Sequence, residues 1–174
     1  MKKTLELAKV NQVSVGAHPG YPDLVGFGRR SMSCSKDEII ALVTYQIAAI
    51  DGVAKSLGLE LEYVKPHGAL YNDMMMNINV REAIFTALSL YHKPLKLMLQ
   101  ATPQIEQHNI EASSKAGAVH TKDKMLAQVK QLQEHGSVTT INGHTLQLNA
   151  DSLCVHGDNI EGVKAIKEIR DLIG

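Results

Sequence analysis

The chain has 174 residues, with 18 lysines and arginines against 18 aspartates and glutamates. This length fits one domain with a sizeable core, since domains commonly run to roughly 100–200 residues. The balanced charge gives no broad positive field for nucleic acid, and aromatic residues, at 4%, are too few for stacking platforms. No apolar run approaches the roughly 20 residues that span a bilayer, and Met1-Lys2-Lys3 leads into an amphipathic pattern instead of a signal peptide. We expect a cytoplasmic protein that acts on a small polar molecule.

Helical and strand-like segments alternate through most of the sequence. In chain order, we expect a helix at residues 2–11, a strand at 12–15, a helix at 39–57, a strand at 59–64, a helix at 80–91, a strand at 95–99, a helix at 121–135, a strand at 152–155 and a helix at 160–173. Such alternation favours parallel βα units, in an open sheet or a barrel. Residues 107–117 interrupt the pattern, because no clear strand follows there.

Local signals mark the ends of several elements. Ser35 and Glu38 have the spacing of a capping box ahead of the 39–57 helix. Gly136 is the expected C-terminal stop of the 121–135 helix. Asn142-Gly143 lies between two β-prone runs and therefore predicts a local antiparallel hairpin.

Two irregular segments follow the first two predicted strands. Residues 16–34 contain four glycines and two prolines with little periodicity, and residues 65–73 form the expected loop after the second strand. The methionines at 74–76 are interpreted as flexible packing around that loop. Long loops of this kind commonly hold functional residues, so we expect the polar site at these two segments.

Three histidines come directly after predicted strands. The motifs are Gly16-Ala17-His18-Pro19-Gly20, Lys65-Pro66-His67-Gly68 and Cys154-Val155-His156-Gly157-Asp158. In α/β folds, ligands bind at the carboxyl ends of the parallel strands. A single histidine there is more often a solvated loop residue, but three of them beside glycine or proline favour a shared site. Asp158 either orients a histidine or caps the last helix.

Further polar residues lie in the same two loops. Arg29 and Arg30 suit a carboxylate or phosphate, because a guanidinium binds such groups with two hydrogen bonds, although surface salt bridges involving Asp23 are an equal alternative. Lys65 precedes a proline that holds its backbone extended, which makes it a candidate anion anchor. Tyr71 is either a hydrogen-bond donor to a developing oxyanion or a structural tyrosine.

Several common catalytic motifs are absent from the sequence. There is no Gly-x-x-x-x-Gly-Lys-Ser/Thr loop, no Gly-x-Ser-x-Gly elbow and no His-Glu-x-x-His zinc helix. The two cysteines are too few for a disulfide scaffold and too far apart for a Cys-x-x-Cys motif. Any dependence on ATP therefore requires another kind of nucleotide site or another chain.

The residues at 15–30 and 64–72 resemble the LamB/YcsF family, which includes the A subunit of bacterial 5-oxoprolinase. The resemblance is carried by Val15-Gly16-Ala17-His18-Pro19-Gly20-Tyr21-Pro22-Asp23 with the following glycines and arginines, and by Val64-Lys65-Pro66-His67-Gly68-Ala69-Leu70-Tyr71-Asn72. The segment from Cys154 to Asp158 is similar to the family's closing signature. The resemblance extends over nearly the whole chain.

The resemblance implies an irregular parallel (β/α) barrel of the glycoside hydrolase/deacetylase type, formed by residues 1–174 as one domain. It implies ATP-dependent opening of the cyclic amide 5-oxoproline to L-glutamate, with ATP as cosubstrate and with B and C partner subunits. Two departures from the family pattern are expected. The N-terminal strand and its polar stretch are missing before Met1, and a further family segment is missing near residues 111–114.

The leading hypothesis is that this domain supplies the hydrolytic half of 5-oxoprolinase. In that scheme His18, His67, Asp23 and Tyr71 are the catalytic candidates, and the two histidines are also the candidate ligands of a divalent metal. The substrate-binding candidates are Arg29, Arg30, Lys65, His156 and Asp158. The alternatives are a regulatory subunit that binds a small carboxylate without catalysis, and a metal-dependent deacetylase-like hydrolase; a homo-oligomer is left open.

Overall fold

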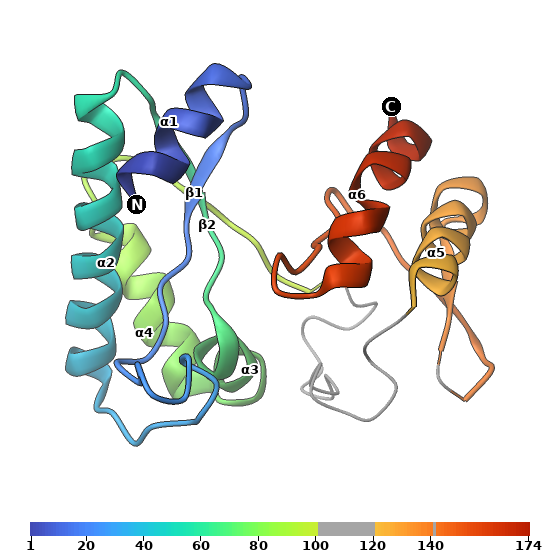
Figure 1. Cartoon of the computed structure of the whole chain (residues 1–174). Coiled ribbons are helices and arrows are strands. Elements are labelled where there is room, and N and C mark those ends of the chain that lie inside the picture. The colour runs from blue at the N-terminus through green and yellow to red at the C-terminus, as the bar shows by residue number, and fades with distance from the viewer. Residues whose placement is uncertain (101–120, 141) are drawn as a thin grey trace. The chain divides into compact units, whose positions relative to one another are not determined.

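The computed structural model describes residues 1–100, 121–140 and 142–174 (Figure 1). The chain divides into two compact units, Met1–Leu99 and Gln100–Gly174, and each is described by itself.

The first unit is a small βα arrangement built on a parallel sheet. Its elements are α1 (Lys2–Val10), β1 (Val15–Ala17), α2 (Lys36–Ser56), β2 (Leu61–Val64), α3 (Gly68–Met76), α4 (Ile78–Ser89) and β3 (Lys96–Leu97). The strands are parallel in the order β1-β2-β3, with Val15 beside Leu61 and Val64 beside Leu97. The expected parallel pairing of the first three strands is therefore confirmed.

Helix α2 forms the main apolar wall of the first unit and packs against α4 and the strands (Figure 1). Its capping box is confirmed, because the Glu38 amide donates to the Ser35 hydroxyl at 3.3 Å and the Ser35 amide donates to the Glu38 carboxylate at 2.7 Å. Ile39, Val43 and Ile47, spaced four residues apart, are buried against the core. The sequence pattern thus determines both where this helix begins and which face it buries.

Helix α2 also carries a buried carboxylate, Asp51. Lys93 Nζ donates to it at 2.7 Å and the Tyr91 hydroxyl donates at 3.0 Å. Burial opposes ionisation, but these two hydrogen bonds hold the pKa of Asp51 below its ordinary value. By length and composition α2 is apolar enough to cross a membrane, a test that the core helix of a globular protein also passes.

The prediction of a loop over residues 65–73, with the methionines at 74–76 packed around it, is wrong for most of this segment, because residues 68–76 form helix α3. The chain becomes helical at Gly68 and remains so to Met76, with Leu70, Met74 and Met75 buried. Leucine and methionine are good helix formers, and the spacing of Leu70 and Met74 places both on one face. The glycine and proline that suggested a loop lie at the start of the helix, not within it.

The second unit combines two helices with a hairpin. Its elements are α5 (Lys122–His135), β4 (Ser137–Thr139), β5 (Thr145–Gln147) and α6 (Ile160–Ile173). The expected stop at Gly136 is confirmed, since this residue has a left-handed φ of 59°. The antiparallel pairing of β4 with β5 confirms the hairpin. Val129, Ala165 and Ile169 form the core between the helices.

The prediction of a strand at residues 152–155 is wrong, because this segment has no regular secondary structure. Leu153 and Val155 nevertheless pack against the core of α5 and α6. Their alternation reflects packing on helices, and among the described residues no neighbouring strand pairs with them. The expected deletion near residues 111–114 and the weak segment at 107–117 lie outside the described residues.

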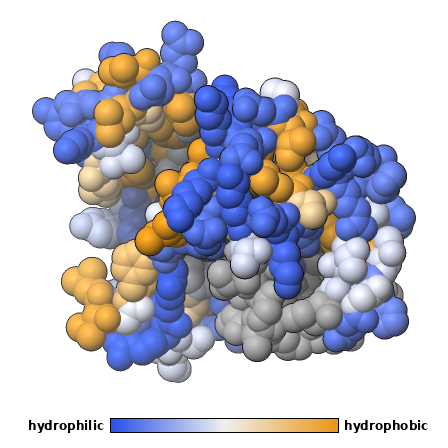
Figure 2. All heavy atoms as spheres, turned by 45° about the vertical axis from the view of Figure 1, so that its right-hand side comes forward, coloured by the Kyte–Doolittle hydropathy of each residue, from blue (hydrophilic) through white to orange (hydrophobic). Residues whose placement is uncertain are grey.

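Hydrophobic side chains are not confined to the interior. Figure 2 shows separate hydrophobic patches among hydrophilic ones on one face of the molecule. Leu24 and Val25, at the tip of the loop after β1, are 95% and 94% exposed.

Candidate functional site

The loop after β1 is attached by backbone hydrogen bonds to the end of β2 and the start of α3. The Lys65 amide donates to the Ala17 carbonyl at 2.9 Å, and the His67 amide donates to the Pro19 carbonyl at 2.8 Å. Further along, the Ala69 amide donates to the Gly28 carbonyl at 2.9 Å. These bonds bring the two predicted site segments together in the first unit.

The contact between the two segments requires glycine at two positions. Gly68 has a left-handed φ of 56°, and a Cβ atom there would lie 2.4 Å from the Gly28 carbonyl oxygen. Gly28 has a φ of 67°, and its Cβ would lie 2.9 Å from the His67 ring. A side chain at either position would push the loop away from α3.

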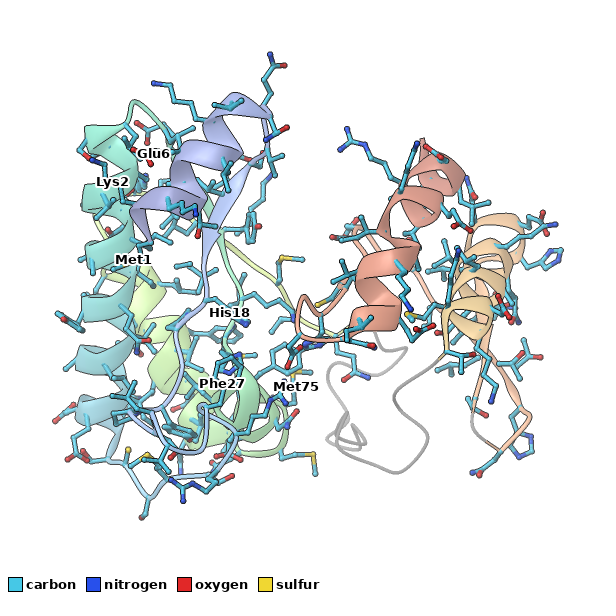
Figure 3. The ribbon with its side chains drawn as sticks, in the orientation of Figure 1. Met1, Lys2, Glu6, His18, Phe27 and Met75 are labelled. Atoms are coloured by element: carbon cyan, nitrogen blue, oxygen red, sulfur yellow. The ribbon has the colours of Figure 1, made fainter. Side chains whose placement is uncertain are left out.

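His18 and His67 lie against each other at the centre of this contact. His18 Nε2 is 2.9 Å from His67 Nδ1, and the ring centroids are 4.7 Å apart in an edge-to-face arrangement. The outer ring nitrogens face backbone carbonyls, with His18 Nδ1 2.5 Å from Lys65 O and His67 Nε2 2.7 Å from Phe27 O. Figure 3 labels His18 and Phe27 near the start of α3. His18 is exposed and His67 half-buried, so water and small molecules can reach the pair.

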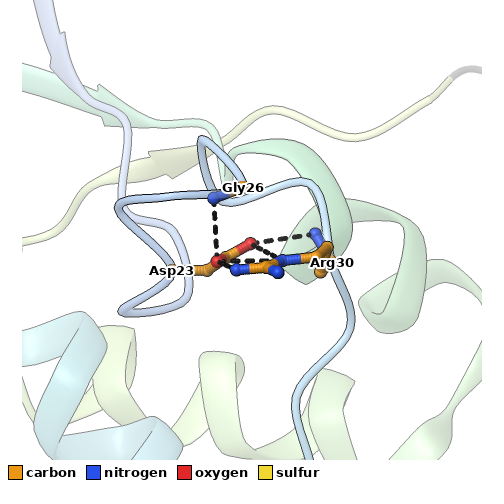
Figure 4. Close-up of polar contacts among 3 residues, drawn as sticks. All are labelled: Asp23, Gly26 and Arg30. Atoms are coloured by element: carbon orange, nitrogen blue, oxygen red, sulfur yellow. Dashed lines mark hydrogen bonds and ion pairs between the residues drawn. The ribbon is translucent and has the colours of Figure 1, made fainter.

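Asp23 and Arg30 form an ion pair within the loop (Figure 4). Arg30 Nε donates to the Asp23 carboxylate at 3.0 Å, the guanidinium also donates through Nη2, and the Gly26 amide donates at 3.0 Å. The hydrogen bonds from Arg30 hold the pKa of Asp23 down to about 2, against the effect of burial and with help from Gly26. Both predicted site residues are thus engaged in holding the loop closed.

Replacing Asp23 with asparagine is expected to remove an acid-sensitive part of the stability. The native pKa of about 2 lies below the ordinary value of 3.8, so the carboxylate stabilises the fold above pH 3.8 and this contribution is lost as the pH falls to about 2. Urea midpoints measured across this range should therefore differ most between wild type and Asp23→Asn at the upper end. Asp37→Asn, which changes an exposed aspartate of the same unit, serves as the control. A constant difference at every pH would contradict the assignment.

The other predicted cations contact aromatic rings of the same two segments, including that of Tyr71. Lys65 Nζ is 5.3 Å from the centre of the Tyr71 ring, and the Arg29 guanidinium is 5.4 Å from the centre of the Phe27 ring. Both distances are within the range of cation–π contacts. Arg29 and Lys65 therefore place positive charge on the same two segments, and the Phe27 ring under Arg29 also contacts the His67 ring.

Comparison with known proteins places these segments in a family context. The sequence profile of the LamB/YcsF family matches residues 1–116 and 106–174. The chain belongs to the LamB/YcsF family. It is 38% identical to one of the 5-oxoprolinase A subunits of Pseudomonas putida, covering 99% of this chain and 77% of that protein. It is 39% identical to the 5-oxoprolinase A subunit of Vibrio vulnificus, covering 99% and 80%.

A solved structure of similar fold is the lactam utilization protein from Thermus thermophilus. The TM-score is 0.80 at 30% sequence identity, with 99% of this chain and 79% of that chain covered. The alignment with the Pseudomonas putida protein runs over 199 positions, whereas this chain has 174 residues. Some residues of that relative therefore have no counterpart in this chain.

Within this LamB/YcsF chain, three further residues hold the loop in place and were not anticipated. The Tyr21 hydroxyl donates to Asp73 at 2.9 Å and the Ser31 hydroxyl donates to the same carboxylate at 2.8 Å. Burial, together with the Asp73 carboxylate, raises the pKa of Tyr21 above its ordinary range. The predicted loop at 65–73 concealed this role of Asp73, whereas the aromatic Tyr21 between two loop prolines was a usable signal.

His156 and Asp158 belong to the second unit, in the segment before α6, where both are exposed. Their part in substrate binding stays a prediction. The capping alternative for Asp158 is wrong, because the side chain of the next residue, Asn159, accepts the Glu161 amide at the start of α6.

A divalent metal does not fit the histidine pair as it is arranged. All four ring nitrogens of His18 and His67 face each other or a backbone carbonyl. Among the described residues, no three histidine, cysteine or acidic side chains are grouped as metal ligands. The metal role of the two histidines stays a prediction, and no catalytic step is derived from it.

Proposed function

We propose that this chain is the A subunit of a 5-oxoprolinase, which hydrolyses the lactam of 5-oxoproline to L-glutamate with ATP and with B and C partner subunits. The observation that carries the proposal is the identity of 36–39% with proteins named as A subunits of 5-oxoprolinase, over nearly the whole chain. The word "subunit" in those names supports an assembly with other chains. The paired histidines supply a group suited to hydrolysis in the two loops that carry the resemblance to the family.

The proposed chemistry follows from the weakness of a lactam as an electrophile. ATP-dependent activation makes the carbonyl carbon reactive, and water then attacks it. We assign the proton transfer from that water to the His18–His67 pair, which water can reach because His18 is exposed; one of the two facing ring nitrogens must first turn from its partner towards the water. Lys65 and Arg29 are the proposed sources of positive charge for the substrate carboxylate or a phosphoryl group. Arg30 forms an ion pair with Asp23. Tyr71, beside Lys65, is the candidate donor to the developing oxyanion.

We also propose that the fold is an irregular (β/α) barrel and that the protein works in the cytoplasm. The likeness to the Thermus thermophilus structure and the three parallel strands support the barrel. The packing of α2 as a core helix and the balanced charge support a cytoplasmic site of action.

Reconstitution with the partner subunits tests this function. Glutamate formation from 5-oxoproline is measured with ATP for the full assembly, for the assembly lacking this chain, and for this chain alone. We expect glutamate only from the full assembly. Full activity without this chain would refute the catalytic role and favour a regulatory subunit. Release of acetate from acetylated substrates by the chain alone would favour the deacetylase-like alternative.

A further inference from the structure

Three large apolar side chains lie in the exposed part of the loop after β1. Leu24, Val25 and Phe27 are 95%, 94% and 62% exposed, and we call these three residues the apolar tip. Single exposed apolar residues are common on protein surfaces, whereas several that are contiguous mark a binding surface. Leu24 and Val25 bury almost none of their surface within this chain, so core packing does not account for them.

Polar groups next to the apolar tip hold it in one conformation. The buried Asp23 carboxylate accepts the amides of Gly26 and Arg30 at 3.0 and 3.3 Å, and the Asp23 carbonyl accepts the Gly28 amide at 2.8 Å. A Cβ atom on Gly26 would collide with the side chains of Asp23 and Arg30, so this close turn requires glycine. A surface that is already ordered loses less conformational entropy when it binds a partner.

Phe27 connects the apolar tip to the candidate site. Its φ of 54° is left-handed, which is rare for a bulky residue. Its carbonyl oxygen is 2.7 Å from His67 Nε2, and its ring meets the His67 ring edge to face at a centroid distance of 5.2 Å. Backbone strain of this kind is found at functional sites. A molecule bound to the apolar tip therefore lies next to the histidine pair.

We propose that the apolar tip docks this chain onto a partner subunit of the assembly proposed above, by entering an apolar hollow with a carboxylate at its edge; this rests on the proposed function. Three side chains cover less than the roughly 800 Å² that each protein contributes to a standard interface, so the tip is an anchor within a larger contact. The Arg29 guanidinium is 5.4 Å from the centre of the Phe27 ring and places a positive charge beside the tip. A carboxylate on the partner complements that charge.

The position of the apolar tip beside His67 favours a partner subunit over other occupants. The sequence has no Gly-x-x-x-x-Gly-Lys-Ser/Thr loop, so the proposed use of ATP requires another kind of nucleotide site or another chain. An activated carbonyl reacts with bulk water, and a subunit docked at Phe27 covers the site where that loss would occur. A second copy of this chain would bring only groups that the chain already has, and a membrane would bring no catalytic group.

Calorimetric titration of this chain with the B and C partner subunits tests the docking. We expect Leu24→Gln/Val25→Gln to bind at least about 30-fold more weakly than the wild type, which is the effect of losing a strong interface anchor. Both residues are exposed, so the thermal midpoint should not change. The matched control is Leu7→Gln/Val10→Gln, which changes an exposed apolar pair on α1 and should bind like the wild type. Equal affinity of the tip variant and the wild type would overturn the proposal.

Turnover at increasing partner concentration separates docking from catalysis. Leu24→Gln/Val25→Gln should regain wild-type glutamate formation when the partner subunits are in excess, because the change lowers affinity and leaves the candidate site residues in place. Turnover that stays low at saturation would show that the tip acts on the substrate and would overturn the docking role. If the wild-type assembly forms no glutamate while the tip variant still binds its partners weakly, the proposed function is refuted and the docking surface stands.

Two further measurements test the chemistry of the partner. Arg29→Glu should weaken binding more at low salt than at high salt, because it places a like charge against the carboxylate at the edge of the hollow. Wild-type affinity of this variant at low salt would contradict that carboxylate. Sedimentation equilibrium of the chain alone, and flotation with vesicles of phosphatidylglycerol and phosphatidylcholine, test the other occupants. Self-association or vesicle binding that Leu24→Gln/Val25→Gln abolishes would overturn the assignment to a partner subunit.

Discussion

Replacing His67 with glutamine is expected to lower 5-oxoproline turnover by the reconstituted enzyme about 10²–10⁴-fold, the usual contribution of a general acid or base. The glutamine amide can still donate to the Phe27 carbonyl, but it takes up no proton at neutral pH. His67 is half-buried and contacts the loop mainly through its ring nitrogens, so the thermal midpoint should change little. Glutamate formation and thermal unfolding are measured on the same preparations.

The matched control for this change is His144→Gln, which alters an exposed histidine in the β4–β5 hairpin. Its turnover should equal that of the wild type. If the His67 variant assembles, melts like the wild type and retains most of its turnover, His67 is a structural loop residue and the proposed mechanism is wrong.

The change Gly68→Ala is expected to cause the largest loss of stability among single methyl additions in the first unit. The left-handed backbone costs of order 1–3 kcal/mol for a residue other than glycine. The added Cβ would also lie 2.4 Å from the Gly28 carbonyl oxygen, which is backbone and cannot rotate away. For a chain of this size, each 1 kcal/mol lowers the thermal midpoint by roughly 2–4 °C. Circular dichroism during heating measures the shift.

Substitutions at two other glycines distinguish the cost of backbone strain from the cost of the steric clash with the Gly28 carbonyl oxygen. Gly58 has a φ of 71°, and an added Cβ there would be no closer than 3.7 Å to Lys9 Nζ, so Gly58→Ala reports the strain alone. Gly52 lies inside α2 with open space around it, and Gly52→Ala should stabilise the helix by about 0.5–1 kcal/mol. A Gly68→Ala variant as stable as Gly58→Ala would show that the loop moves away at no cost.

Short-range rules predicted the elements whose causes are local. The Ser35–Glu38 box, the Gly136 stop and the Asn142-Gly143 hairpin depend on a few neighbouring residues, and all three are confirmed. The start of α3 was missed because Gly68 signals a turn, although here its left-handed backbone allows contact with Gly28. The segment at 152–155 was misassigned because alternating apolar residues can pack on helices as well as on strands.

The sequence predicted which residues belong to the site, but it did not predict the hydrogen bonds between them. Position after a strand identified His18 and His67, because parallel strands bring their carboxyl ends together. The partners of their outer nitrogens are backbone carbonyls, which every residue has and no sequence pattern distinguishes. For the same reason, the engagement of Asp23 with Arg30 was only one of two equal alternatives until the loop conformation was known.

The hydrogen bonds of the loop after β1 have a consequence for its exchange with solvent. Gly26 and Arg30 donate their amides to the Asp23 carboxylate, Gly28 donates to the Asp23 carbonyl, and Ala69 donates to the Gly28 carbonyl. In deuterated water the amide hydrogens of Gly26, Gly28 and Arg30 should be replaced as slowly as those of a helix, although the loop has no regular secondary structure. All three donate to Asp23, Gly28 to its carbonyl and the other two to its side chain, so Asp23→Ala should release the amides of Gly26 and Arg30 first, as a pair. Mass-resolved exchange of peptides from this loop would show whether it opens as one cooperative segment.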